Sequence, residues 1–305
     1  GFGSGSADAI DIATGRPGGK LVADDAAVGD LFAAQVAIDG GVAIVGAEYD
    51  DDNGNASGSA YLFDVATGQQ TVKLTPDDGD REARFGYRVA IDGGVALVGA
   101  PRDDGNGINS GAAYLFDVAT GRQTAKLTAA DPVAQDHFGS SVAIDGGVAI
   151  VGAPYDGDNG FASGAAYLFD AATGQQLAKL LPSDGSSLDR FGLTVAIDGG
   201  LALVSAQGED AFGSVYLFDV GAGRELAKLA PGEVEAGEGF GSSVALDGGV
   251  AIVGAPGDDS DSGAAYLFDV SAFVIPEPTG AALAFAAMLA ATGARARIRT
   301  RQRSE

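Results

Sequence analysis

Residues 138–154 read Phe-Gly-Ser-Ser-Val-Ala-Ile-Asp-Gly-Gly-Val-Ala-Ile-Val-Gly-Ala-Pro. The same phrase begins five times, at spacings of 53, 53, 53 and 49 residues, and each copy runs through an Asp/Asn/Gly-rich stretch into a motif such as Ser-Gly-Ala-Ala-Tyr-Leu-Phe-Asp. The opening phenylalanines are Phe32, Phe85, Phe138, Phe191 and Phe240. Self-similarity at a fixed period is the signature of a repeat architecture, so the repeat predicts the fold.

Each repeat divides into four short strands, which we label A to D. Examples are 142–144 for A, 148–153 for B, 114–117 for C and 176–180 for D. Asp-Gly-Gly joins A to B, and Asp-Gly between apolar runs is a strong hairpin signal because type I′ turns need positive φ. A Val-Ala-Thr-Gly turn joins C to D. Four antiparallel strands per repeat, in series, predict an all-β protein, a β-propeller of four-stranded antiparallel blades.

The propeller is expected over residues 1–273, with repeats starting near 32, 85, 138, 191 and 240 and a partial blade over 4–22. The chain begins with strands C and D, and the last repeat has A, B and C. Two interpretations follow. The N-terminal strand D completes the last blade and closes a five-bladed ring, or the chain is a fragment of a six- or seven-bladed ring.

The charge balance excludes several classes of function. The chain has 42 acidic and 18 basic residues and a net charge of −24, which argues against nucleic-acid binding. It has no cysteine and one histidine, so disulfides, thiolate sites and multi-histidine metal sites are excluded. Its five lysines share one position in strand D and are predicted to protect sheet edges: Lys20, Lys73, Lys126, Lys179 and Lys228.

Most of the acidic residues fall in the B–C and D–A loops, which should lie at one end of the blades and form a negative face. Closely spaced Asp and Asn suggest calcium, which takes carboxylate and amide oxygens. The alternative is a set of solvated turns. The candidate metal ligands are Asp50, Asp52, Asn53, Asp103, Asp104, Asn106, Asp156, Asp158, Asn159, Asp258, Asp259 and Asp261.

Three further loop residues differ from their counterparts in the other repeats. His137 stands where other copies have arginine or glycine, and is expected to be a solvated loop residue. No Gly-x-Ser-x-Gly elbow accompanies it, so the chain is expected not to be an enzyme. Phe161 and Phe212, in B–C loops, are either exposed ligand contacts or loop anchors.

The pairs Phe85-Gly86 and Phe138-Gly139, with Gly99-Ala100-Pro101 and Gly152-Ala153-Pro154, resemble the FG-GAP repeat of integrin α-subunit propellers and bacterial surface proteins. The resemblance covers roughly residues 4–272. It implies an extracellular or surface binding module. Integrin-type repeats often carry a calcium motif in the A–B loop. Here that loop is only Asp-Gly-Gly, too short to wrap a cation.

The tail, residues 274–305, has a different pattern. Pro276, Glu277 and Pro278 precede a 16-residue apolar run and an arginine-rich end, and a short C-terminal hydrophobic helix is expected. At 1.5 Å per residue the run spans roughly 24 Å, less than a ~30 Å hydrocarbon core. The order of parts resembles the PEP-CTERM sorting signal. The resemblance implies a Gram-negative-type bacterium, export, processing by an exosortase, and a transient membrane anchor.

Together these features predict an exported bacterial module for surface or matrix binding and adhesion. Its acidic loop face would contact an extracellular polysaccharide or a surface protein, with calcium as a candidate cofactor. Two alternatives stand beside this hypothesis. One is a structural spacer whose acidic residues serve solubility. The other is the non-catalytic propeller of a larger secreted hydrolase.

Overall fold

The computed structural model describes residues 5–11, 16–208, 213–230, 238–258 and 262–273. Their regular structure is almost entirely β, as the repeat predicts. The strands are β1 (Ala7–Asp11), β2 (Arg16–Leu21), β3 (Gln35–Asp39), β4 (Val42–Ala47), β5 (Ser59–Asp64), β6 (Gln69–Leu74), β7 (Arg88–Asp92), β8 (Val95–Ala100), β9 (Ala112–Asp117), β10 (Arg122–Leu127), β11 (Ser141–Asp145), β12 (Val148–Ala153), β13 (Ala165–Asp170), β14 (Gln176–Leu180), β15 (Val195–Asp198), β16 (Leu201–Ala206), β17 (Ser214–Asp219), β18 (Arg224–Leu229), β19 (Ser243–Asp247), β20 (Val250–Ala255) and β21 (Ala264–Asp269).

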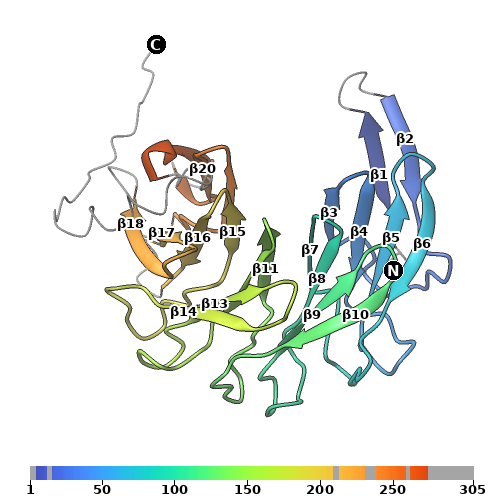
Figure 1. Cartoon of the computed structure of the whole chain (residues 1–305), viewed down its shortest axis with the longest axis horizontal. Helices are drawn as coiled ribbons and strands as arrows, with labels where there is room; N and C mark the ends of the chain where they lie inside the picture. The colour runs from blue at the N-terminus through green and yellow to red at the C-terminus, as the bar shows by residue number, and fades with distance from the viewer. Residues whose placement is uncertain (1–4, 12–15, 209–212, 231–237, 259–261, 274–305) are drawn as a thin grey trace.

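Four antiparallel sheets of four strands follow one another along the chain, and each is one blade. Blade 1 is β3–β6, blade 2 is β7–β10, blade 3 is β11–β14 and blade 4 is β15–β18; blade 5 has β19–β21, and β1 and β2 form a two-stranded sheet. The blades are arranged in an arc (Figure 1). Contacts between neighbouring blades join β3 to β7, β7 to β11, β11 to β15 and β15 to β19. Strand A therefore lines the centre and strand D the outside.

The arc is open between the β1–β2 sheet and blade 5 (Figure 1). Among the described residues, β2 pairs with β1 and is not the outer strand of blade 5, so the closed five-bladed arrangement is not observed. Apolar side chains are exposed at both ends of the arc: Ile38 is 65 % exposed and Leu267 63 %. Their counterparts Ile144 and Leu168 in blade 3 are buried because a neighbouring blade covers them.

The Asp-Gly-Gly turns form as the sequence predicts, and they also join neighbouring blades. Gly146 and Gly147 have φ of 55° and 81°, the conformation that a type I′ turn requires. The Gly146 N–H donates to Oδ2 of Asp92, in the preceding blade's turn, at 3.0 Å. The same bond links Asp39 to Gly93 and Asp145 to Gly199. The aspartate of each of these turns therefore links its blade to the turn of the next blade by a hydrogen bond.

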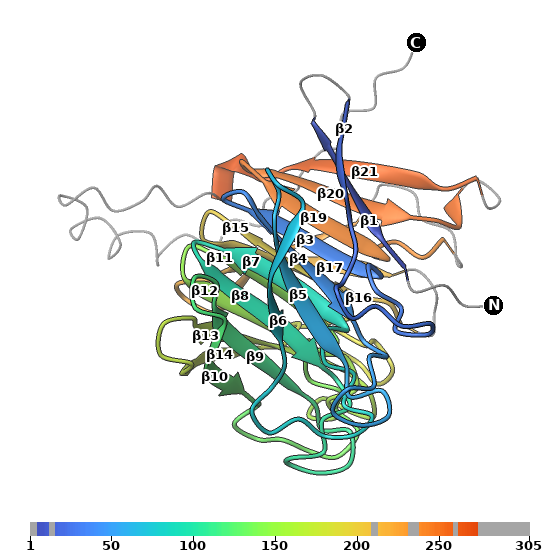
Figure 2. The same ribbon diagram turned by 90° about the vertical axis from the view of Figure 1, so that its right-hand side faces the viewer.

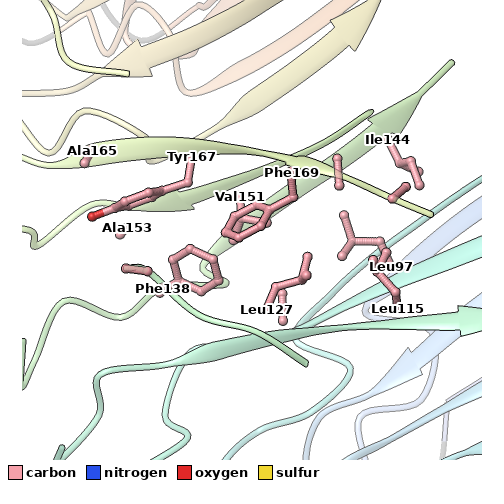
Figure 3. Close-up of a cluster of buried hydrophobic side chains, with 14 residues drawn as sticks. Leu97, Leu115, Leu127, Phe138, Ile144, Val151, Ala153, Ala165, Tyr167 and Phe169 are labelled. Carbon is pink, nitrogen blue, oxygen red and sulfur yellow. The ribbon is translucent and has the colours of Figure 1, made fainter. Parts of the chain in front are cut away.

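The repeat phenylalanine fills the core between blades. The Phe138 ring meets Tyr167 and Phe169 edge-on, at centroid distances of 5.4 and 5.7 Å (Figure 3). Leu97 of blade 2 and Val151 of blade 3 belong to the same buried cluster. Burial of these large apolar groups is the dominant stabilising term for such an interface.

The glycine of the Phe-Gly pair is favoured for two reasons: its φ is positive, and a side chain there would collide with neighbouring backbone atoms. Gly86 has φ of 88°, and a Cβ there would lie 2.3 Å from the Ser59 carbonyl oxygen. The first copy has Ala33 at this position, and Ala33 adopts φ of 70°. Its N–H still donates to Gly46 O at 3.0 Å, as Gly86 does to Gly99 O. The alanine therefore keeps the glycine geometry in a region that L-residues disfavour.

The described chain ends with a short 3-10 turn, η1 (Ser271–Phe273). The hydrophobic helix expected within 274–305, and the Pro276-Glu277-Pro278 motif, lie outside the described residues. No helix within the described ranges has the length and apolar character needed to cross a membrane.

Candidate functional site

The B–C loop of each blade lies against the D–A loop that follows it, and we call this end of the molecule the loop rim. Backbone N–H groups of Gln135 and Leu188 donate to the carbonyl oxygens of Ile108 and Phe161, at 2.8 and 2.7 Å. Figure 2 shows long loops of neighbouring blades gathered at one end. The prediction that both loop sets share one face is confirmed for the described residues.

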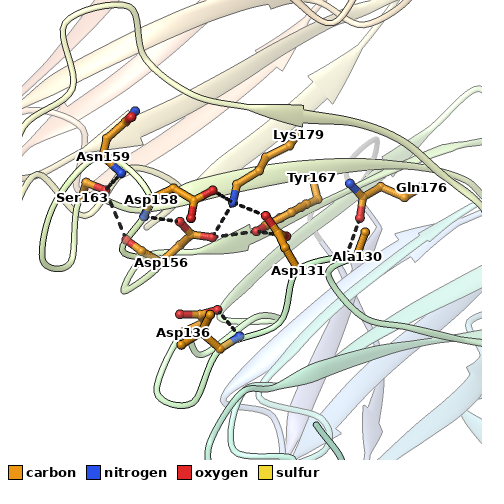
Figure 4. Close-up of polar contacts among 11 residues, drawn as sticks. Ala130, Asp131, Asp136, Asp156, Asp158, Asn159, Ser163, Tyr167, Gln176 and Lys179 are labelled. Carbon is orange, nitrogen blue, oxygen red and sulfur yellow. Dashed lines mark hydrogen bonds and ion pairs between the residues drawn. The ribbon is translucent and has the colours of Figure 1, made fainter. Parts of the chain in front are cut away.

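A lysine in strand D organises the acidic residues of the loop rim. In blade 3, Lys179 Nζ lies 2.9 Å from Oδ2 of Asp131, 2.9 Å from Oδ2 of Asp156 and 2.5 Å from Oδ2 of Asp158 (Figure 4). The Tyr167 hydroxyl donates to Asp156 Oδ2 at 2.7 Å. Lys179 Nζ also lies 5.2 Å from the centroid of the Tyr167 ring. We call this arrangement the Lys–Asp–Tyr cluster.

The cluster recurs with fewer acidic partners in some blades. Lys73 in blade 1 binds three aspartates, whereas Lys126 in blade 2 binds two and Lys228 in blade 4 binds one, Asp184. The side chains of Lys73, Lys126 and Lys179 are only 16–23 % exposed. Their ammonium groups pair with the loop carboxylates, a role that the sequence did not predict, while the protection of sheet edges stays a prediction.

These contacts shift the ionisation of both partners. Burial alone would raise the pKa of Asp131, but the hydrogen bond and charge of Lys179 outweigh it and lower the pKa below its usual value. Burial alone would lower the pKa of Lys179, but hydrogen bonds to Asp131 and Asp158 raise it well above its usual value. The cluster is therefore a set of fixed ion pairs at neutral pH.

The candidate metal ligands do not gather into one site, because each B–C loop keeps its own set. Asp50, Asp103, Asp156 and Asp258 are buried and each accepts the hydroxyl proton of its blade's strand-C tyrosine. Asp104 caps its own loop through the Asn109 N–H at 2.6 Å. The loop-tip residues Asn53, Asn106 and Asn159 are exposed, and Asp259 and Asp261 lie outside the described residues.

One acidic group does fit the geometry of a cation site. Carboxylate oxygens of Asp25, Asp50 and Asp52 all lie within 4.8 Å of one another. Lys73 Nζ lies 2.6, 3.1 and 2.5 Å from these three groups. The donor oxygens suit a hard cation such as calcium, but the ammonium holds the centre of the group. Asp25 was not among the candidates predicted from the sequence.

The expectation that His137 is solvated is wrong. Its ring is half-buried and lies 5.1 Å from the Tyr155 ring. Burial lowers the pKa of His137, and the charges of Arg102 and Arg84 lower it further. The histidine is therefore neutral at pH 7.

Phe161 is not a loop anchor: its side chain is 78 % exposed at the loop rim. Ile108 and Val133 are also largely exposed there, and sequence reasoning missed both. The signal was present, because Ile108 follows Gly107 in its loop as Phe161 follows Gly160. Phe212 lies outside the described residues. The loop rim of blades 2 and 3 therefore presents apolar side chains among acidic ones.

Comparison with known families agrees with this architecture. The FG-GAP repeat model matches five segments: residues 18–63, 69–116, 122–169, 175–218 and 224–268. The chain belongs to the FG-GAP repeat family. A search of curated proteins found no match. The family supports a β-propeller module of the kind often found outside the cell or on its surface. Each matched segment of this FG-GAP propeller runs from a strand D through strands A and B into the strand C of the next blade.

Proposed function

We propose that this FG-GAP propeller is a non-catalytic binding module of an exported bacterial protein, which attaches to the cell surface or extracellular matrix through its loop rim. The observation that carries the proposal is the exposure of Phe161 and Ile108 at equivalent positions of adjacent blades. Exposed apolar side chains on loops held by a rigid scaffold are characteristic of recognition surfaces.

The loop rim is rigid enough to present these side chains. The Phe161 carbonyl accepts a backbone bond from Leu188, and the Lys179 ion pairs fix the same loop at Asp156 and Asp158. A preorganised loop loses little conformational entropy on binding. The exposed acidic groups around it favour partners that are neutral or carry positive charge at the contact.

The test is retention of the full chain on cells of the producing bacterium. Phe161→Ser removes the most exposed of these side chains and should release the protein into the medium. Leu177→Ser is the matched control, since Leu177 is 55 % exposed on β14, away from the loop rim. Unchanged retention of Phe161→Ser would favour the spacer alternative.

Calcium is proposed as a second ligand of the loop rim, at Asp25, Asp50 and Asp52. The clustering of three carboxylates within 4.8 Å favours it. Because Lys73 binds all three, calcium would have to displace the ammonium. Calcium and Lys73 would therefore compete for the same oxygens.

Export and sorting are proposed from the sequence of the tail. Pro276-Glu277-Pro278, the apolar run and the arginine-rich end support recognition by an exosortase-type enzyme and a transient membrane anchor. The mass of the protein recovered from the cell surface tests this, because processing would remove the arginine-rich end. Recovery of the surface protein with an intact C-terminus would contradict it.

A further inference from the structure

A pocket of about 380 Å³ opens where the central ends of the D–A loops meet the start of the B–C loops. Arg84, Arg88 and Arg102 line it, together with His137 and Tyr155. Leu193, Thr194 and Ser242 belong to the same lining. Its volume falls in the range of small-ligand pockets, about 300–1,000 Å³.

The charge of this pocket is opposite to that of the protein. The chain carries a net charge of −24, yet the described residues that line the pocket include three arginines and no Asp or Glu. Within the described ranges Arg88 and Arg102 form no ion pair, and Arg84 only approaches Glu48, at 3.7 Å. The arginines are therefore an incompletely neutralised positive group in an acidic protein.

Aromatic rings hold two of the arginines in place. The Arg84 guanidinium carbon lies 4.8 Å from the Tyr49 centroid, and that of Arg88 lies 4.6 Å from the Tyr87 centroid. Arg88 Nη1 also donates to the Tyr87 carbonyl oxygen at 3.1 Å. Stacked guanidinium groups keep their remaining N–H donors in a fixed plane.

The charges of the arginines also affect two half-buried titratable neighbours, His137 and Glu48. The charges of Arg102 and Arg84 reinforce the effect of burial in lowering the pKa of His137. Burial raises the pKa of Glu48, while Arg84, Arg88 and Arg102 oppose that rise. An anion bound among the arginines would relieve the repulsion that His137 experiences.

We propose that this pocket binds the carboxylate of a uronic acid, the acidic sugar of anionic polysaccharides. Guanidinium groups bind carboxylates through paired, charge-assisted hydrogen bonds. The hydroxyls of Ser140, Thr194 and Ser242 donate to protein oxygens, so their own oxygens can accept hydrogen bonds from the hydroxyls of a sugar ring. A peptide carboxylate lacks the ring hydroxyls that this lining would satisfy. The pocket shares no residue with Phe161 or Ile108, so this inference goes beyond the proposed function.

The only histidine of the chain reports directly on this pocket. We would titrate the full chain with galacturonate and follow the imidazole proton resonances of His137 by NMR. Saturable shifts at millimolar concentration are expected, together with a rise in the pKa of His137. Galactose, which lacks the carboxylate, should bind at least about tenfold more weakly, the equivalent of about 1.4 kcal/mol.

Variants distinguish binding in the pocket from attraction of galacturonate by arginines elsewhere on the protein. Arg88→Ala and Arg102→Ala should each weaken galacturonate binding about tenfold or more. Arg122→Ala, at an exposed arginine of β10, should leave it unchanged. Equal binding of galactose, an equal loss in Arg122→Ala, or no shift of His137 would overturn the proposal. Tighter binding of an acetylated Asp-containing peptide than of galacturonate would overturn the sugar assignment.

Discussion

The ammonium of Lys179 lies 2.9 Å from Oδ2 of Asp156, a carboxylate whose side chain is only 3 % exposed. The lysine comes from the outer strand of blade 3 and the aspartate from its B–C loop, 23 residues earlier. In blades 1 to 3, the acidic propeller therefore pairs its buried B–C loop carboxylate with a lysine of the same blade. The number of acidic partners per lysine falls from three in blades 1 and 3 to one in blade 4.

Loss of Lys179 should destabilise the protein more than loss of Lys228. Lys179→Met leaves Asp156 buried without its cation, and the expected cost is about 2–4 kcal/mol. Lys228→Met breaks one pair whose groups are 40 % and 52 % exposed, and should cost about 1 kcal/mol or less. The midpoints of urea unfolding compare the two. Equal midpoints would show that the burial of Asp156 does not matter.

Ala33→Gly should stabilise the protein, because Ala33 has φ of 70° and glycine adopts this conformation without strain. The expected gain is about 1 kcal/mol. The reverse change, Gly86→Ala, should cost more than about 2 kcal/mol, because its Cβ would lie 2.3 Å from the Ser59 oxygen. Thermal unfolding of both variants measures the difference. A destabilised Ala33→Gly would refute the strain assigned to Ala33.

Asp136→Asn should stabilise the protein above pH 6. Burial raises the pKa of Asp136 to about 6, although its bond from the Val133 N–H opposes the shift. A raised carboxyl pKa means that the folded state holds the proton more tightly than the unfolded state. Stability is therefore lost as pH rises from about 4 through 6, by about 1–3 kcal/mol. Asparagine accepts the same N–H bond without charge.

The measurement is the free energy of unfolding as a function of pH for wild type and Asp136→Asn. The two curves should meet near pH 4 and separate above pH 6, with the variant more stable. Asp77→Asn, at an exposed loop position, is the matched control. Curves that stay parallel from pH 4 to pH 7 would contradict the raised pKa.

Lys73→Met should increase calcium affinity, because it frees the oxygens of Asp25, Asp50 and Asp52. Calorimetry should give an apparent dissociation constant at least about tenfold lower than for wild type. Calcium should also raise the unfolding temperature of the variant. Lys228→Met, whose lysine binds only Asp184, is the control. Weaker binding in Lys73→Met than in wild type would show that calcium does not compete with the lysine.

The repeat predicted the blades closely. Strands B and D of blade 3 begin and end where the sequence pattern placed them, because Asp-Gly-Gly and the glycine-ended turns fix the register. The Lys179–Asp131 contact joins residues 48 apart, across the loop between two blades, and no local pattern encodes such a distance. In blades 1 to 3 a constant offset of 23 residues separates the lysine from its B–C loop aspartate, and this repeat-to-repeat signal could have predicted the pair.

The arginine pocket escaped prediction for a different reason. Arg88 and Arg102 occupy positions at which the third repeat has Ser141 and Tyr155. Because these arginines are not shared by the other repeats, comparison of the repeats gives no sign that they form a site. Only the arrangement of neighbouring blades around a centre brings Arg88, Arg102 and His137 to one pocket.

The central claim is that the loop rim attaches the propeller to the cell surface or matrix. Retention of the Ile108→Ser/Phe161→Ser double variant on producing cells, measured beside Leu177→Ser, tests it most directly. The account predicts that the double variant is released into the medium while Leu177→Ser stays bound. Retention of the folded double variant at the wild-type level would contradict it.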